Sequence, residues 1–207
     1  EGIIIKFNED LTWEDALNVN SYFSNTLEKL EYLSKQESDV FYNSDIDTFE
    51  NKKILRTPEL SEQFKEARSL LESFRQGKLQ THEVFDIDKL AKYFAVNTLF
   101  GAEHASAWNN IRFYYNPITS RLEPIGFDST GLIGERMNAY EIIEKYTSEC
   151  QLNTNCSQKP ALYNLIFSHK IFFEKYMGEL EKISKQSYLD EFFLELDVEI
   201  KKNVDII

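Results

Sequence analysis

The sequence has neither an excess of basic residues nor a long apolar run. Its 23 lysines and arginines stand against 35 aspartates and glutamates, which gives a formal net charge of −12. Nucleic-acid backbones and anionic membranes both favour a basic surface, so we expect no nucleic acid as the main partner. No apolar run approaches the roughly 20 residues that a membrane-spanning helix needs, so we also expect no membrane insertion. The acidic charge still permits a metal cation, a basic protein, or a nucleotide held through a metal.

Cysteine is almost absent. The two cysteines, Cys150 and Cys156, lie in one polar stretch. A disulfide formed in an oxidising compartment and two unpaired surface thiols both remain open, whereas a metal site of two cysteines without a nearby histidine is disfavoured. The chain begins with neither Met nor a basic-then-apolar leader. We therefore expect a processed protein or a trimmed piece, from which a removed signal peptide would leave no trace.

Apolar and aromatic residues are plentiful. The chain of 207 residues is 42% hydrophobic and carries 16 phenylalanines and 11 tyrosines, enough for a large core. It has no internal repeat and no low-complexity segment. A chain of this length and composition predicts a single folded domain over residues 1–207 rather than a disordered chain.

Hydrophobic periodicity predicts a mostly helical α+β fold with one central β-hairpin. Helix stops and caps support this prediction, notably Gly77 after one apolar stripe and Asp86 before the next. Residues 37–58 alternate apolar and turn-forming residues, which predicts irregular structure or short strands. The expected elements are a strand at Ile3–Phe7, helices at 12–30, 60–74 and 87–98, a hairpin of Ile111–Tyr115 and Leu122–Phe127, and helices at Ala139–Tyr146, Ala161–Tyr176 and Tyr188–Val204.

The candidate site lies at the open end of this hairpin. Asn110 precedes the first strand and Asp128 follows the second, so the turn between the strands brings them within a few ångströms. One amide oxygen and one carboxylate are hard ligands that suit Mg²⁺ or Mn²⁺. His104, in the loop before the first strand, is positioned to accept a proton at the same place. Each residue taken singly also has a structural interpretation, as a cap, a turn former or a helix-end histidine.

Arg112 lies two residues into the hairpin. Strand alternation puts Asn110, Arg112 and Tyr114 on one face, and Ile111, Phe113 and Tyr115 on the other, which we expect to be core. On its face, Arg112 can bind a phosphate of a cofactor, or form an ion pair with Asp128 or Glu123. Trp108 is expected in the core or as a loop anchor, and His82 and His169 have no convergent partners in the sequence.

The order of these motifs resembles the spore coat protein H (CotH) kinase family. The resemblance covers about Thr57 to Leu132 and includes a helix, a Gly-containing loop, an Asn that opens an aromatic strand, and an Asp that follows an aromatic residue after the hairpin. Its residues here are Phe85–Tyr93, Leu99–Gly101, Asn110–Tyr115 and Glu123–Asp128.

The resemblance implies an atypical protein-kinase-like fold that phosphorylates a secreted or coat protein with ATP, and a bacterial, secreted or cell-envelope location. In that family Asn110 and Asp128 correspond to metal ligands, and His104 stands where the family has its catalytic Asp. Neutral imidazole can accept a proton but lacks the negative charge that orients the hydroxyl.

A Gly-rich phosphate loop and its partner strand lysine are missing upstream of the first helix. We therefore expect the N-terminal, nucleotide-covering part of a kinase-like domain to be absent from residues 1–207. The leading hypothesis is a CotH-like kinase that uses Mg²⁺ or Mn²⁺ and ATP on a protein substrate, with His104 as the catalytic residue, Arg112 at the cofactor and Asn110 and Asp128 at the metal. The alternative is a non-catalytic kinase-like module that binds a partner in the cell envelope or surface layer.

Overall fold

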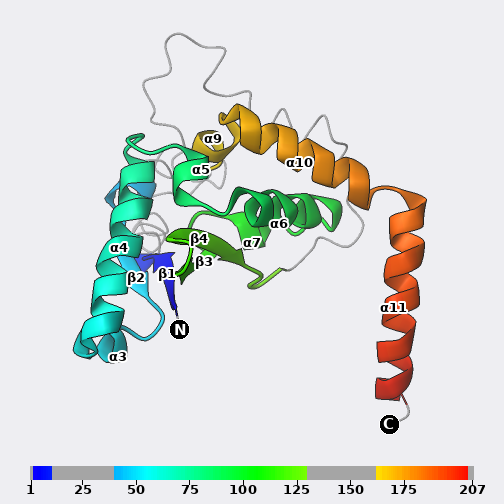
Figure 1. The fold of residues 1–207 in the computed structure, drawn as a ribbon, viewed down its shortest axis with the longest axis horizontal. Coiled ribbons are helices and arrows are strands. Elements are labelled where there is room, and N and C mark those ends of the chain that lie inside the picture. The colour runs from blue at the N-terminus through cyan, green and yellow to red at the C-terminus, as the bar shows by residue number, and fades with distance from the viewer. Residues whose placement is uncertain (1, 11–39, 130–161, 205–207) are drawn as a thin grey trace, which may run out of the picture.

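A computed structural model describes residues 2–10, 40–129 and 162–204 (Figure 1). The helices expected at 12–30 and Ala139–Tyr146, and both cysteines, lie outside these residues. The described elements confirm a mostly helical α+β fold. In chain order they are β1 (Ile3–Phe7), β2 (Ile46–Thr48), α3 (Asn51–Arg56), α4 (Pro58–Arg75), α5 (Thr81–Val84), α6 (Ile87–Leu99), α7 (Glu103–Ser106), β3 (Arg112–Asn116), β4 (Arg121–Ile125), α9 (Leu162–Phe167), α10 (Lys170–Ile183) and α11 (Gln186–Val204).

The four strands form one antiparallel sheet in the order β2-β1-β3-β4. The central hairpin of β3 and β4 is confirmed, with Arg112 opposite Ile125. The sequence did not reveal that β1 pairs with β3, with Ile3 opposite Tyr115. It also did not reveal α3 in the segment expected to be irregular, where β2 is a short strand. Among the described residues, no helix is long and apolar enough to cross a lipid bilayer.

One face of the sheet carries the core. Residues on this face alternate with partly exposed ones along β1, because successive strand side chains point to opposite faces. The helix α4 packs against β1, and α6 and α5 pack against β4. Trp108 is buried there as expected, against the rings of Phe7 and Phe41. The buried hydrophobic strand residues of this face are Ile3, Ile5, Phe7, Ile46, Phe113, Tyr115 and Leu122.

Local signals determine the bounds of α4 and α6. Pro58 begins α4, where its missing N–H costs nothing, and Gly77 follows its end with a φ of 69°. The carboxylate of Asp86 accepts a hydrogen bond from the backbone N–H of Lys89 and caps α6. Both helices were predicted, α4 with its stop at Gly77 and α6 with its cap at Asp86, whereas the start of α4 at Pro58 was not.

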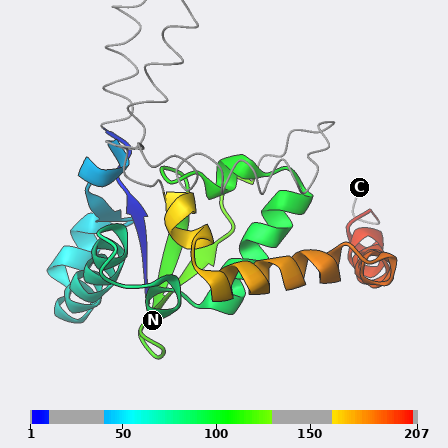
Figure 2. The same ribbon diagram turned by 90° about the horizontal axis from the view of Figure 1, so that it is seen from above.

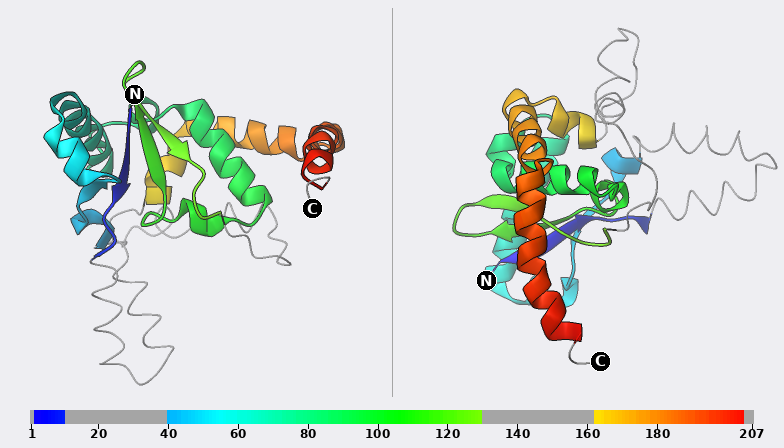
Figure 3. Two further views of the ribbon diagram at one scale, coloured as in Figure 1. Left: turned by 90° about the horizontal axis from the view of Figure 1, so that it is seen from below. Right: turned by 90° about the vertical axis from the view of Figure 1, so that its right-hand side faces the viewer.

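The prediction of a single helix at Ala161–Tyr176 is wrong, because the helix is interrupted between α9 and α10. Ser168 and His169 separate the two helices, and the His169 side chain caps α10 by accepting the N–H of Phe172. The helix α10 then lies along α6 (Figures 1 and 2). Beyond Ser184, α11 projects from the body of the molecule (Figures 1 and 3).

Candidate functional site

The open end of the hairpin brings three of the predicted site residues together. His104 lies on α7, Asn110 lies in the turn before β3, and Asp128 follows β4. The Nε2 atom of His104 lies 3.1 Å from Oδ2 of Asp128. The side-chain amide of Asn110 donates a hydrogen bond of 3.1 Å to the backbone carbonyl of His104.

The His104–Asp128 pair faces solvent. The two side chains are 55% and 43% exposed, so a ligand can reach both. Asp128 has a φ of 47°, in the left-handed region that non-glycine residues seldom occupy. Such backbone conformations cost about 1–3 kcal/mol and cluster at functional sites. The carboxylate orients the imidazole, as expected for a histidine that accepts a proton.

Asn110 is nearly buried, with 8% of its surface exposed. Its backbone N–H donates to the carbonyl of Ala107, and its side-chain Nδ2 donates to His104. These bonds tie the turn before β3 to α7. Of the two polar atoms of this amide, Oδ1 is the one able to ligate a hard cation, since Nδ2 is a hydrogen-bond donor.

The helix α6 holds α7 in position. The hydroxyl of Tyr93 donates to the backbone carbonyl of Ala105 over 2.7 Å, and the amide of Asn97 donates to the hydroxyl of Ser106 over 2.9 Å. Burial raises the pKa of Tyr93, so its hydroxyl stays protonated and remains a donor. These two hydrogen bonds fix α7, and with it His104, against α6 in the core.

Arg112 is buried beneath the candidate site, with 5% of its surface exposed. Its Nη1 atom donates to the backbone carbonyl of Asn109 over 3.0 Å and to that of Ile111 over 3.3 Å. The guanidinium also lies over the ring of Phe127 at 5.0 Å and over that of Phe49 at 5.7 Å. These contacts hold the turn before β3, and we therefore interpret Arg112 as a positioning residue.

The acidic neighbour of Arg112 differs from those expected. Nη2 lies 3.7 Å from Oε1 of Glu9, which follows β1. Burial lowers the pKa of Arg112, while the nearby charges of Glu9 and Asp128 act in the opposite direction. Glu123, one of the two expected partners, instead pairs with Lys89 at 2.7 Å. Glu9 was missed because its approach to β3 depends on the pairing of β1 with β3.

The cation ligands expected from the sequence are one amide and one carboxylate. Asn110 and Asp128 offer an amide and a carboxylate oxygen, and Mg²⁺ commonly takes few protein ligands and completes its shell with water or phosphate oxygens. Within residues 2–10, 40–129 and 162–204, no group of three histidine, cysteine, aspartate or glutamate side chains could hold a metal. Arg112 is buried against backbone carbonyls, so any nucleotide phosphate would be held through the cation rather than by this guanidinium.

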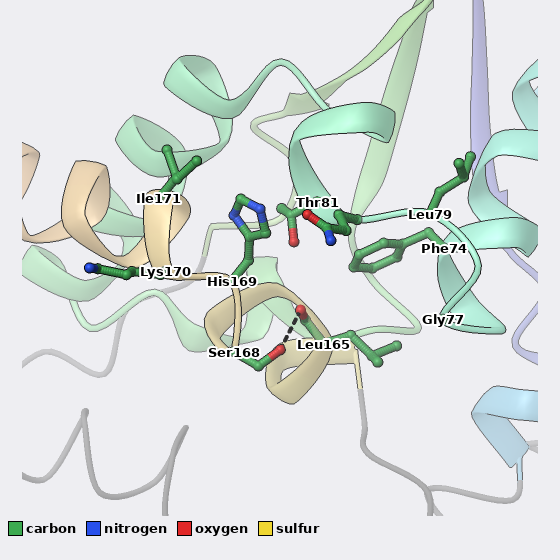
Figure 4. A pocket seen from close by; sticks show the side chains of 10 residues that line it. Phe74, Gly77, Leu79, Thr81, Leu165, Ser168, His169, Lys170 and Ile171 are labelled. Carbon is green, nitrogen blue, oxygen red and sulfur yellow. Dashed lines mark hydrogen bonds between the residues drawn. The ribbon is translucent and has the colours of Figure 1, made fainter.

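A cavity of about 450 Å³ lies elsewhere, between the α4–α5 turn and the start of α10 (Figure 4). At its edge, Nδ1 of His82 lies 3.0 Å from Nε2 of His169. The expectation that these histidines have no convergent partners is therefore wrong. Their rings are 4.9 Å apart and come from α5 and the cap of α10, a contact that only the packing of these helices creates. The cavity is lined by Phe74, Gly77, Leu79, Gln80, Thr81, Leu165, Ser168, His169, Lys170 and Ile171.

Comparisons with protein-family models, with curated proteins and with solved structures found no match. The resemblance to the CotH kinase family therefore remains a prediction from the residues of the sequence.

Proposed function

We propose that this chain is a CotH-like kinase domain that transfers phosphate from ATP to a hydroxyl group of a protein, with Mg²⁺ or Mn²⁺ at the open end of the hairpin. One observation supports this function above the others. His104 and Asp128 are in contact at 3.1 Å, and the amide of Asn110 bonds to the carbonyl of His104. These contacts support the proposal, because they join residues that the family resemblance assigns to one reaction.

Each side chain has a distinct role in this proposal. Oδ1 of Asn110 and the carboxylate of Asp128 hold the cation, which neutralises the charge on the phosphates when bound. The imidazole of His104 accepts the proton of the attacking hydroxyl. The hydroxyl oxygen bonds to the terminal phosphorus of ATP while the bond to the ADP oxygen breaks. Arg112 keeps the turn that carries Asn110 in place.

The partner in this proposal is a protein substrate that is secreted or belongs to the cell envelope or a spore coat. This part of the proposal depends on the family resemblance. The net charge of −12 is compatible with it, because an acidic surface favours a basic protein segment over nucleic acid.

Thermal unfolding with MgCl₂ or MnCl₂, with and without ATP, tests the site. A ligand at 100 times its dissociation constant stabilises the folded state by about 2.7 kcal/mol, which for a chain of this size raises Tm by about 5–10 °C. We expect Asp128→Asn to abolish this rise. Asp45→Asn is the matched control, because Asp45 is an exposed aspartate whose nearest cation is Arg68, 3.5 Å away. An equal rise in Tm for Asp128→Asn and the wild type would contradict the proposed site.

The second candidate is a non-catalytic kinase-like module that binds a partner. Two features favour it: His104 stands where the family has its catalytic Asp, and Arg112 is buried with its guanidinium bonded to backbone carbonyls. Autophosphorylation with terminally labelled ATP separates the two functions. Transfer that disappears in His104→Ala, while the cation-dependent rise in Tm remains, supports the kinase. A rise in Tm without any transfer supports the module.

A further inference from the structure

The cavity of about 450 Å³ between the α4–α5 turn and the start of α10 is lined by a buried hydroxyl group that has no partner. This hydroxyl belongs to Thr81, which is 1% exposed and whose Oγ1 atom forms no hydrogen bond within the described residues. In Figure 4 it points into the space between His169 and Leu165. Native proteins rarely leave a buried hydroxyl unpaired, because the group has given up its hydrogen bonds to water. The cavity therefore offers a donor whose acceptor the protein itself does not supply.

The first turn of α10 adds two backbone donors at the same cavity. The helix has 14 residues, and its N–H groups point back toward its start, where Lys170 and Ile171 line the cavity. The Nδ1 atom of His169 accepts the N–H of Phe172. No acceptor within the described residues takes the N–H groups of Lys170 and Ile171. The partial positive charge at the start of a helix makes such N–H groups a place for an anion.

The walls of the cavity indicate a singly charged ligand with an apolar body. Figure 4 shows Phe74 and Leu79 across the cavity from Lys170, and Leu165 also lines it. Among the described residues on its wall, Lys170 is the only lysine or arginine, and its Nζ already lies 3.7 Å from Oε1 of Glu174. A doubly charged phosphate would find little charge to balance it. Small-molecule sites of about 300–1,000 Å³ are likewise mostly apolar, with a few polar groups that fix the orientation of the ligand.

We propose that this cavity binds a small monocarboxylate with an apolar body. The carboxylate lies at the start of α10 and accepts hydrogen bonds from the N–H groups of Lys170 and Ile171 and from the hydroxyl of Thr81. A carboxylate suits these donors, because the ionised group only accepts and can take several hydrogen bonds at once. The apolar body lies against Phe74 and Leu79. The proposal does not depend on the kinase function, because it involves neither ATP nor a metal.

Isothermal titration calorimetry of the whole chain with phenylacetate and with hexanoate tests the site. Each probe joins one carboxylate to an apolar body of a size that the cavity can hold. We expect at least one of them to bind with a dissociation constant below about 1 mM. Two matched probes separate the parts of the ligand: phenethyl alcohol has the aromatic body without the charge, and acetate has the charge without the body. Both should bind at least about tenfold more weakly than the better acid.

Thr81→Val tests the buried donor, because valine keeps the shape of the side chain without its hydroxyl. Since this hydroxyl has no partner in the free chain, the variant should keep or raise the Tm, and it should bind the acids about tenfold more weakly. Thr57→Val is the matched control. The hydroxyl of Thr57 donates to the carbonyl of Lys53 at the opposite end of α4 from the cavity. This control should bind the acids as the wild type does.

Lys170→Met tests the charge, because it removes the ammonium group and leaves the backbone N–H groups in place. It should weaken binding of the acids about threefold and leave the weak binding of phenethyl alcohol unchanged. Lys182→Met is the matched control, since Lys182 lies in the last turn of α10 and pairs with Glu179 at 3.4 Å. Circular dichroism checks that each variant keeps its helix content.

Three results would overturn the proposal. The first is a wild-type chain that binds neither acid up to about 10 mM. The second is equal affinity for phenylacetate and phenethyl alcohol, which would mean that the cavity does not recognise a carboxylate. The third is unchanged affinity for the acids in both Thr81→Val and Lys170→Met, which would place the bound acid elsewhere on the chain.

Discussion

Replacement of His169 by alanine should destabilise the fold by an amount that depends on pH. His169 Nδ1 accepts the N–H of Phe172 at 3.3 Å and so caps α10, which leaves the Nε2 proton to be donated to Nδ1 of His82 at 3.0 Å. Loss of a helix cap costs about 1 kcal/mol. Loss of one partly exposed hydrogen bond costs about 1 kcal/mol more. The sum is about 2 kcal/mol, or a fall in Tm of about 4–8 °C for a chain of this size.

The pH dependence follows from the state in which His169 is held. Burial lowers the pKa of His169 below 6.5, the neighbouring His82 lowers it further, and Glu83 acts in the opposite direction. The charge of Lys170, the residue that follows His169, is paired with Glu174 on α10, with Nζ 3.7 Å from Oε1. Because the folded state disfavours the proton, the unfolded chain binds it first as the pH falls. The stabilisation is complete above about pH 6.5 and is lost as the pH falls through the lowered pKa of the folded state.

Urea unfolding at pH 8 and at pH 5 measures this effect. The cost of His169→Ala should be largest at pH 8 and smaller at pH 5, where the wild type has already lost part of the interaction. His169→Asn is the matched control, because asparagine also caps a helix but does not titrate in this range. Its stability should therefore change less with pH than that of the wild type. A double-mutant cycle with His82→Ala should give a coupling energy at pH 8.

Equal costs of His169→Ala at the two pH values, together with no coupling to His82, would refute this reasoning. That result would mean that the two rings contact each other without exchanging a hydrogen bond that matters to stability.

Two further predictions concern the turn and the core. Arg112→Met keeps most of the buried volume but leaves the carbonyl of Asn109 without its donor, so we expect a loss of about 1–3 kcal/mol in urea unfolding and a smaller cation-dependent rise in Tm; full retention of both would contradict the positioning role. Phe94→Ala removes a ring that is 2% exposed and lies edge-on to Phe167 and Phe172, so it should cost about 3–5 kcal/mol in the same measurement. A cost below about 1 kcal/mol would show that α6 and α10 do not share a tightly packed core.

Helix ends and turns that depend on residues close together in the chain were predicted correctly from the sequence alone. The stop of α4 at Gly77 and the cap of α6 at Asp86 were predicted correctly, because caps and stops act within one helical turn. The hairpin was predictable for the same reason, since its two strands are joined by a short turn. The gathering of His104, Asn110 and Asp128 at the open end of the hairpin was expected for the same reason, and the structure shows His104 in contact with both Asp128 and Asn110.

Contacts between segments far apart in the sequence became known only from the tertiary structure. Arg112 meets Glu9 because β1 pairs with β3, and His82 meets His169 because α5 packs beside the start of α10. The interruption between α9 and α10 was not predicted either. The apolar spacing continues through it, and histidine is not a common N-cap residue. These contacts depend on the packing of whole elements against one core. The free energy of that packing is distributed over many side chains, and no short stretch of sequence contains it.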